Sequence, residues 1–121
     1  MKRRDTGILG EQIACEFLGK NGYEIVEKNY RCAEGEVDII AVQGDTLVFV
    51  EVRTKQSKRF GSPEESITPV KKERLRAVAA NYGQNRDGLP VSRRIDMVAI
   101  EMDKKGKPSR IELIENAVSE E

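Results

Sequence analysis

The feature that most constrains this sequence is the stretch 35–55, in which two β-branched, apolar runs flank Gly44-Asp45. A Gly-Asp pair between two such runs is typical of a two-residue β-hairpin loop. If these two residues form the loop, Gln43 pairs with Thr46 and every other cross-strand pair follows by counting outward. The sequence therefore predicts a central, largely buried hairpin with a defined register.

That register brings two acidic residues together. Counting outward from the loop places Asp38 directly opposite Glu51, and one step further Glu36 opposite Arg53. Opposed residues have Cβ atoms about 5 Å apart and point to the same face of the sheet, so two carboxylates there repel. A neighbouring cation, a shared proton or a bound metal must offset this repulsion. Hard divalent ions such as Mg²⁺ favour carboxylate oxygens.

Two interpretations of the acidic pair follow from the residues alone. In one, Arg53, with Lys55 nearby, neutralises Asp38 and Glu51 in a surface ion-pair cluster without further function. In the other, the pair is a functional site that binds a divalent cation, because buried charges require partners.

Composition limits both the size and the chemistry. A chain of 121 residues is expected to form one domain over 1–121, with a core over about 6–114 and with a basic N-terminal arm and an acidic C-terminal tail that are loose. Lysine plus arginine and aspartate plus glutamate both number 21, so a nucleic-acid partner requires a local basic patch. The absence of histidine excludes a Ser-His-Asp mechanism and, with two cysteines, the common zinc ligand sets.

Targeting signals are not visible. The sequence has no apolar run of roughly 18 residues that would predict a membrane span, and its charged N-terminus lacks the apolar segment of a secretory signal. We therefore expect a cytoplasmic protein without a membrane partner, in which Cys15 and Cys32 remain reduced.

The pattern along the chain predicts an α/β fold, a mixed sheet flanked by helices in the order α-β-β-β-α-β-β. A helix capped by Asp5 or Thr6 should end near Lys20, and a second should begin at the Thr68 cap. The predicted strands cover 23–31, the two arms of the hairpin, 94–102 and 110–114. The first three should form an antiparallel meander, and the helical crossover should return the fourth parallel to a central strand.

Three basic segments are candidates for contact with nucleic acid, and each could instead be a solvated surface. They comprise the N-terminal arm, the polar loop 56–66 and the start of the second helix, where basic residues oppose the helix dipole. The residues are Arg3 and Arg4, Lys58 and Arg59, and Lys71 and Lys72.

An α-β-β-β-α-β core with a helical glutamate, an Asp near the start of one strand and E-x-K on the next resembles the PD-(D/E)xK nuclease pattern. The matching residues are Glu11, Asp38 and Glu51-Val52-Arg53. The chain is also similar to the YraN-like family of predicted endonucleases, which resemble archaeal Holliday-junction resolvases. The supporting stretches are G-x-x-G-E-x-x-A at 7–14, G-E-V-D-I-I-A at 35–41, L-V-F-V-E-V-R-T-K at 47–55, F-G-S-P-E-E-S at 60–66, the basic helix after it and R-I-D-M-V-A-I at 94–100.

The resemblance implies a restriction-endonuclease-like fold and a Mg²⁺ or Mn²⁺ site. Asp38 and Glu51 would bind the ion, the Val52 carbonyl would be a third ligand, and Glu11 would join directly or through water. This chain departs from the pattern at Arg53, where the nuclease class has lysine. Arginine cannot give up its proton at neutral pH, although it can clamp a phosphate. Lys55, on the same strand face, is the candidate for the lysine role.

The expected function is therefore metal-dependent hydrolysis of DNA phosphodiester bonds, with branched or repair and recombination intermediates as candidate substrates. A homodimer would supply the two sites needed to cut both strands of a branch. The main alternative is a nucleic-acid-binding protein with a degenerate nuclease site, and a structural or protein-interaction role is a third interpretation.

Overall fold

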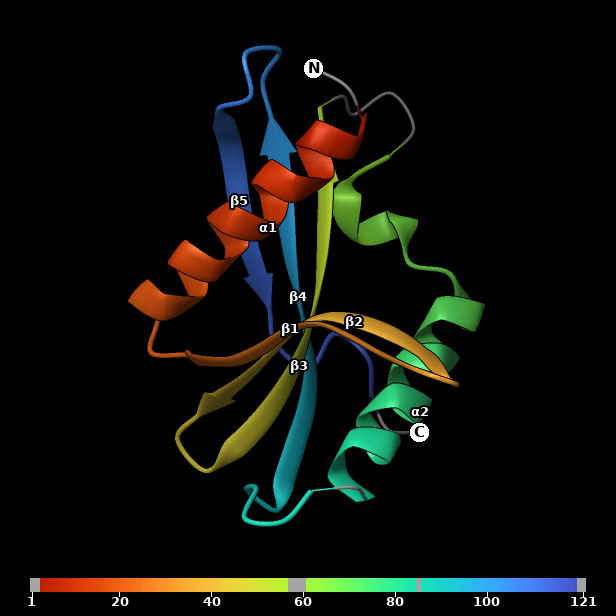
Figure 1. The fold of residues 1–121 in the computed structure, drawn as a ribbon. Helices are drawn as coiled ribbons and strands as arrows, with labels where there is room; N and C mark the ends of the chain where they lie inside the picture. The colour runs from red at the N-terminus through yellow and green to blue at the C-terminus, as the bar shows by residue number, and fades with distance from the viewer. Residues whose placement is uncertain (1–2, 57–60, 85, 120–121) are drawn as a thin grey trace.

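The computed structural model describes residues 3–56, 61–84 and 86–119, with side chains from Asp5 onward. It contains two α-helices, five strands and one 3₁₀ helix (Figure 1). In chain order these are α1 (Arg3–Lys20), β1 (Glu24–Cys32), β2 (Gly35–Gln43), β3 (Thr46–Lys55), η1 (Pro63–Ser66), α2 (Pro69–Gln84), β4 (Ser92–Met102) and β5 (Pro108–Ile114).

The five strands form one mixed sheet in the order β1-β2-β3-β4-β5. The β1–β2, β2–β3 and β4–β5 pairs are antiparallel, whereas β3 and β4 are parallel because α2 carries the chain back across the sheet. The predicted α/β class, meander and parallel return are thus confirmed, and β3 lies at the centre of the sheet.

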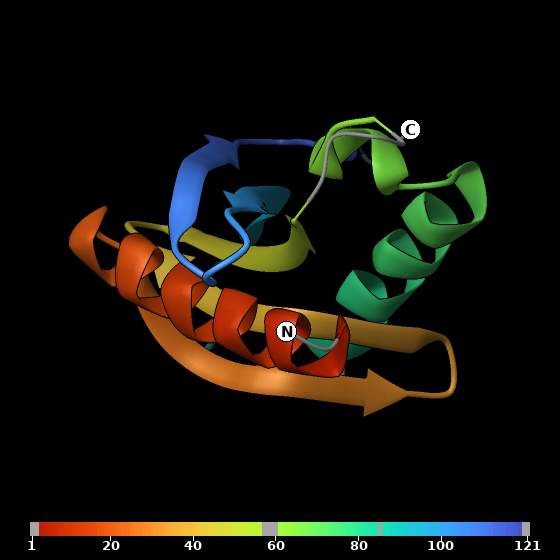
Figure 2. The same cartoon turned by 90° about the horizontal axis from the view of Figure 1, so that it is seen from above.

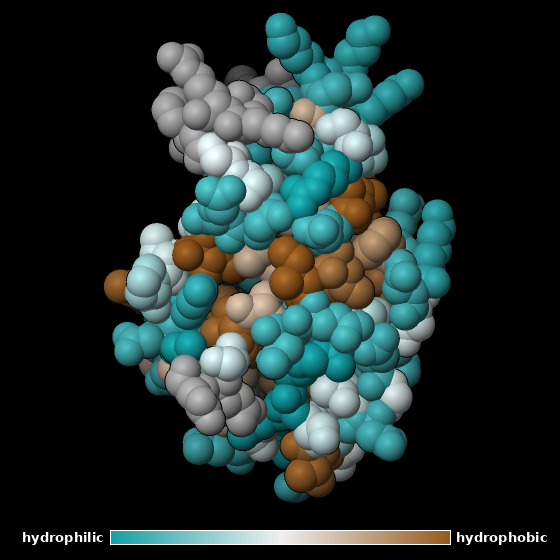
Figure 3. Space-filling view, turned by 180° about the vertical axis from the view of Figure 1, so that it is seen from behind, coloured by the Kyte–Doolittle hydropathy of each residue, from teal (hydrophilic) through white to brown (hydrophobic). Residues whose placement is uncertain are grey.

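The helices lie on opposite faces of the sheet (Figures 1 and 2). On one face Ala14 and Leu18 of α1 pack on apolar residues of β2, β3 and β4, and on the other Leu75, Val78 and Tyr82 of α2 pack on β2 and β3. Both faces of the central strands are therefore buried, which explains their nearly continuous apolar sequence. Seen from behind, hydrophobic surface gathers across the middle of the molecule and is bordered by hydrophilic residues (Figure 3).

Gly10 allows α1 to approach β3 closely. A Cβ at this position would clash with the hydroxyl oxygen of Thr54, so only glycine fits without displacing the helix or the strand. The close approach sets the position of Glu11, the next residue along α1.

The prediction that both ends of the chain are loose is partly wrong. The helix α1 already begins at Arg3, ahead of the predicted Asp5 or Thr6 cap. At the other end the chain after β5 is packed: Val118 is buried, the Asn116 amide donates to Asp96, and the Ser119 carbonyl accepts a hydrogen bond from Arg76. These contacts exist because β5 ends beside β4 and α2, whose polar groups need partners.

The structure differs from expectation at the start of α2 and adds a short helix to the loop before it. The apolar pattern of the second helix also predicts Val70 on its apolar side, but this side chain is 56% exposed because the helix turns it to solvent. The polar loop contains the short helix η1, and Glu64 on this helix pairs with Arg110 of β5, 2.6 Å from its Nη2.

Asp96 is fully buried within the apolar run of β4, and its carboxylate is completely paired. It accepts hydrogen bonds from the Arg94 guanidinium, the Tyr23 hydroxyl and the Asn116 amide at 2.8–3.0 Å. Arg94 also donates to Gln43 at the end of β2. Asp96 therefore has a structural role: its hydrogen bonds connect the segment after α1, the sheet and the C-terminal segment.

Candidate active site

The hairpin ladder stops one pair short of Asp38. The β2–β3 pairing runs from Gln43–Thr46 to Ile39–Val50 and confirms the predicted turn and register over that length. Beyond it, the Asp38 carboxylate accepts a hydrogen bond from the Val52 amide at 2.8 Å. The side chain of Asp38 thus fixes the end of β2 against β3 where the backbone ladder has ended.

The carboxyl group of Glu51 lies beside that of Asp38. Glu51 is buried, and burial, followed by the negative charge of Asp38, raises its pKa to about 7. The two acidic side chains therefore interact, although the ladder from which their pairing was counted ends one pair earlier. The fold keeps Glu51 in an environment that disfavours its charge.

Two cations oppose this effect at Glu51. Arg53 Nη2 lies 2.8 Å from Glu51 Oε2, and Lys71 Nζ of α2 lies 3.7 Å from the same oxygen. The expected contact between Arg53 and Glu51 is thus present, although Glu51 is buried rather than at the surface, and a further cation comes from α2. Lys55 lies further along β3, in register with Glu101 of β4.

Arg53 has an unsatisfied donor. Its Nε is buried and has no hydrogen-bond acceptor among the described residues. Unpaired buried donors are uncommon, and at a functional site the missing acceptor is often a ligand or an ion.

Glu11 approaches Asp38 from α1, the helix on the other face of the sheet from α2. Its pKa is raised, first by partial burial and next by the charge of Asp38, while the Asn29 side chain donates a hydrogen bond to it. The glutamate of α1 is therefore an electrostatic neighbour of Asp38.

The described residues contain no group of three acidic, cysteine or histidine side chains placed to hold a metal ion. Glu11, Asp38 and Glu51 thus do not form a ready-made three-carboxylate cluster, and only Asp38 and Glu51 lie directly side by side. Val52 takes part through its amide, which donates to Asp38.

The remaining predicted residues are Glu36, Lys72 and the basic residues of the N-terminal arm and the polar loop. Glu36, expected opposite Arg53, instead pairs with Arg31 at 3.0 Å, because the β2–β3 ladder does not reach it and Arg31 lies opposite it on β1. Lys72 is partly exposed on α2. The side chains of Arg3 and Arg4, and the whole of Lys58 and Arg59, lie outside the described residues.

The position of Lys71 was not predicted, although the sequence carries a signal for it. Lys71 precedes Leu75 by four residues and Val78 by seven, so all three lie on one stripe of a helix. Leu75 and Val78 are buried against the sheet. A lysine on that stripe points towards the sheet, which explains its contact with Glu51.

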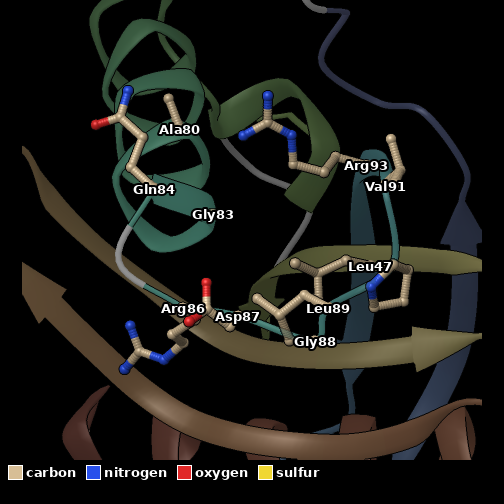
Figure 4. Close-up of a pocket in the computed structure, with 11 residues that line it drawn as sticks. Leu47, Ala80, Gly83, Gln84, Arg86, Asp87, Gly88, Leu89, Val91 and Arg93 are labelled. Atoms are coloured by element: carbon tan, nitrogen blue, oxygen red, sulfur yellow. The ribbon is translucent and has the colours of Figure 1, made fainter.

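A separate hollow of about 440 Å³ lies at the far end of α2 (Figure 4). Its arginines serve the fold: Arg93 donates to the Ala79 carbonyl, and Arg86 stacks on the Tyr82 ring with its guanidinium 3.9 Å from the ring centroid. The acidic pair, by contrast, lies where β2, β3 and the start of α2 meet.

The sequence was compared with known protein families and with curated proteins. A profile described as "Uncharacterised protein family UPF0102" matches residues 10–100. The chain belongs to the UPF0102 family. It is 44% identical over 117 residues to a UPF0102 protein of Moorella thermoacetica, covering 97% of this chain and 98% of that one. It is 46% identical over 117 residues to a UPF0102 protein of Caldicellulosiruptor saccharolyticus, covering 97% and 99%.

The residues of the acidic pair, their cationic neighbours and Glu11 all fall inside the segment that matches UPF0102. The described part of this UPF0102 protein has no helix with the length and apolar character needed to cross a bilayer.

Proposed function

We propose that this UPF0102 protein is a metal-dependent nuclease that hydrolyses phosphodiester bonds in DNA at Asp38 and Glu51. The observation that carries the proposal is the buried Glu51 carboxyl beside Asp38, with its pKa raised to about 7 and two cations at its edge. Such an arrangement costs stability, and perturbed carboxyl pairs of this kind are concentrated at functional sites.

The order of helices and strands supports the same class. The two acidic residues lie on neighbouring central strands, β2 and β3, with the glutamate of α1 nearby. We assign this arrangement to the restriction-endonuclease-like PD-(D/E)xK architecture.

The donor set fits Mg²⁺ or Mn²⁺. Hard divalent cations prefer carboxylate oxygens, and the pair offers two such groups, while Glu11 is an electrostatic neighbour of Asp38. Such an ion, when bound, supplies charge neutralisation at the phosphate and lowers the pKa of water. Asp38 and Glu51 would hold it, and the Val52 carbonyl is the candidate third ligand.

The neighbouring cations have separate roles. Arg53 cannot act as a base, so we assign it to binding the phosphate, for which its unpaired Nε is a free donor. Lys71 brings to Glu51 an amine that can exchange its proton. We therefore assign to Lys71 the lysine role that the pattern otherwise places at position 53.

A cleavage panel tests the proposal. Linear, flapped and four-way DNA are incubated with the purified protein and Mg²⁺ or Mn²⁺. We expect cutting that falls more than about 100-fold in Asp38→Asn and Glu51→Gln, because loss of even an outer-shell partner costs 10–100-fold. The exposed residues Asp87 and Glu16 provide matched controls, Asp87→Asn and Glu16→Gln, which should cut normally.

The binding-only alternative gives a different result in the same panel. DNA binding would be salt-dependent, would survive or strengthen in Asp38→Asn, and would occur without cutting by the wild type. Absence of cutting on every substrate with both metals refutes the nuclease proposal.

A further inference from the structure

A hollow of about 200 Å³ opens between α1 and β1, outside the acidic pair. Figure 2 shows α1 lying along β1 and β2 over this region. The hollow is lined by Ile8, Glu11, Gln12, Cys15, Lys28 and Asn29. The four helical residues recur at spacings of three and four, so they form one face of α1 that looks onto the strand.

The hollow adjoins the candidate active site. Its wall residue Asn29 lies between the paired positions Lys28–Ile39 and Tyr30–Val37, and therefore across from Asp38. Asn29 has a φ of 53°, a left-handed conformation that is uncommon for residues other than glycine. Asparagine tolerates this conformation better than most residues, and here it lies on β1 across from Asp38.

The lining combines apolar and hydrogen-bonding groups. Ile8 is 51% exposed and, with Cys15, provides an apolar surface. Gln12 and Asn29 carry amides, each able to donate and to accept hydrogen bonds. The edge of a nucleobase presents donors and acceptors in the same way, and its ring faces are apolar.

The size of the hollow favours a single ring system. Pockets for drug-sized ligands measure about 300–1,000 Å³, and this hollow is smaller, at about 200 Å³. A base inside a duplex has its ring faces stacked and its pairing edge occupied, whereas an unpaired base can be splayed into a protein pocket.

We propose that the hollow is a subsite for one unpaired nucleobase beside the phosphate that is cut, so that the substrate class is DNA with an unpaired base at the cleavage position. This inference rests on the proposed nuclease function for the phosphate site, but base binding itself requires no cleavage. It assigns the apolar contact to Ile8 and the recognition of the base edge to Gln12 and Asn29.

The test compares binding of two DNA duplexes that differ only by one unpaired 2-aminopurine. Titrations use Ca²⁺, which also takes carboxylate oxygens, and follow both affinity and 2-aminopurine fluorescence. We expect tighter binding of the duplex with the unpaired base, and we expect Ile8→Ala/Gln12→Ala to reduce that preference about tenfold, the effect of losing one or two hydrogen bonds and an apolar contact.

The matched control is Val91→Ala/Gln84→Ala, which removes an exposed valine and an exposed glutamine at the far hollow and should keep the wild-type preference. Since Ile8 and Gln12 are exposed, folding of the test variant is checked by its melting curve. Wild type without any preference for the unpaired base, or a test variant that retains the preference, overturns the inference.

The two proposals can fail separately. DNA cutting without a base preference refutes the subsite and leaves the nuclease function standing. A base preference that depends on Ile8 and Gln12, in a protein that cuts nothing, supports the subsite and refutes the nuclease.

Discussion

At the candidate site, the Glu51 side chain is subject to opposing electrostatic effects. Burial and the charge of Asp38 favour the neutral form of Glu51, whereas Lys71 and Arg53 favour its carboxylate. The first pair of effects is the larger, because the pKa of Glu51 is raised from 4.5 to about 7. In the metal-free protein the charged form of Glu51 therefore opposes folding.

This imbalance predicts how stability depends on pH. The folded protein binds a proton at Glu51 more tightly than the unfolded chain does, so this contribution to stability is complete below pH 4.5 and is lost as the pH rises through about 7. Glu51→Gln cannot lose the proton. We expect its melting temperature in EDTA to exceed that of wild type by several degrees at pH 8, at roughly 4 °C per kcal/mol, with little gain at pH 4.5.

Glu16→Gln, at an exposed position of α1, is the control and should give no pH-dependent gain. A Glu51→Gln difference that is constant across pH, or that grows towards acid, would contradict the placement of Glu51.

Lys71 and Lys72 are neighbours on α2 with different surroundings. Comparing substitutions of the two lysines therefore distinguishes a role in catalysis at the site from general electrostatic attraction to DNA. Lys71 faces Glu51, whereas Lys72 is the next residue around the helix and is partly exposed. We expect Lys71→Met to lower kcat for DNA cleavage about 100-fold, in the range of general acid–base contributions, with less effect on KM.

Lys72→Met should chiefly weaken DNA binding and reduce its salt dependence. Equal losses of kcat in the two variants would assign both lysines to phosphate binding only.

Among the structural elements, α2 has the most direct influence on the site. Its start is fixed by Thr68, whose hydroxyl accepts a hydrogen bond from the Lys71 amide at 3.1 Å. The cap thus orients the turn that carries Lys71 to Glu51. Because Thr68 caps the N-terminus of α2 and directly precedes Pro69, the start of the helix is well defined.

Removing this cap should destabilise the protein. We expect Thr68→Ala to lower the free energy of unfolding by about 1 kcal/mol, measured by urea denaturation. Thr68→Ser, which retains the hydroxyl, is the control and should recover most of the loss. No change in Thr68→Ala would mean that the cap contributes nothing to α2.

The elements also mark where sequence reasoning succeeded. The Gly44-Asp45 turn and the β-branched runs predict the hairpin because they act locally, and its register follows by counting. The Thr68 cap and the crossover of α2 were predictable for the same reason. The end of the ladder at Ile39–Val50 was not, because neither glycine nor proline marks a break in the strand at Asp38.

In the whole molecule, the C-terminal segment is part of the fold. Asn116, Val118 and Ser119 contact Asp96, the α2-side core and Arg76 respectively. The acidic composition of the tail predicted a solvated segment. Val118 alone could not reverse that prediction, because its burial depends on the groove between α2 and β4, which only the tertiary structure provides.

Truncation after Glu115 tests this role. Removal of the buried Val118 should cost about 1.5–3 kcal/mol, and loss of the Asn116 amide leaves one acceptor position of the buried Asp96 unsatisfied, at a further cost of about 1 kcal/mol. We expect a melting temperature lower by several degrees. Truncation after Ser119, which keeps these contacts, is the control; equal stability of the two truncated chains would contradict the packed tail.

The parallel pairing of β3 with β4 has a consequence for the order in which the molecule is assembled. A ribosome releases Asp38, Glu51 and Arg53 early, as parts of one local hairpin, but Lys71 can settle against them only after α2 has found its place on the sheet. The core that α2 packs against includes Ile95 of β4, and β4 begins only at Ser92, because a parallel strand needs a long connection. The acidic pair therefore emerges before its second counter-charge, and a nascent chain stopped within α2 carries the carboxylates without the finished site.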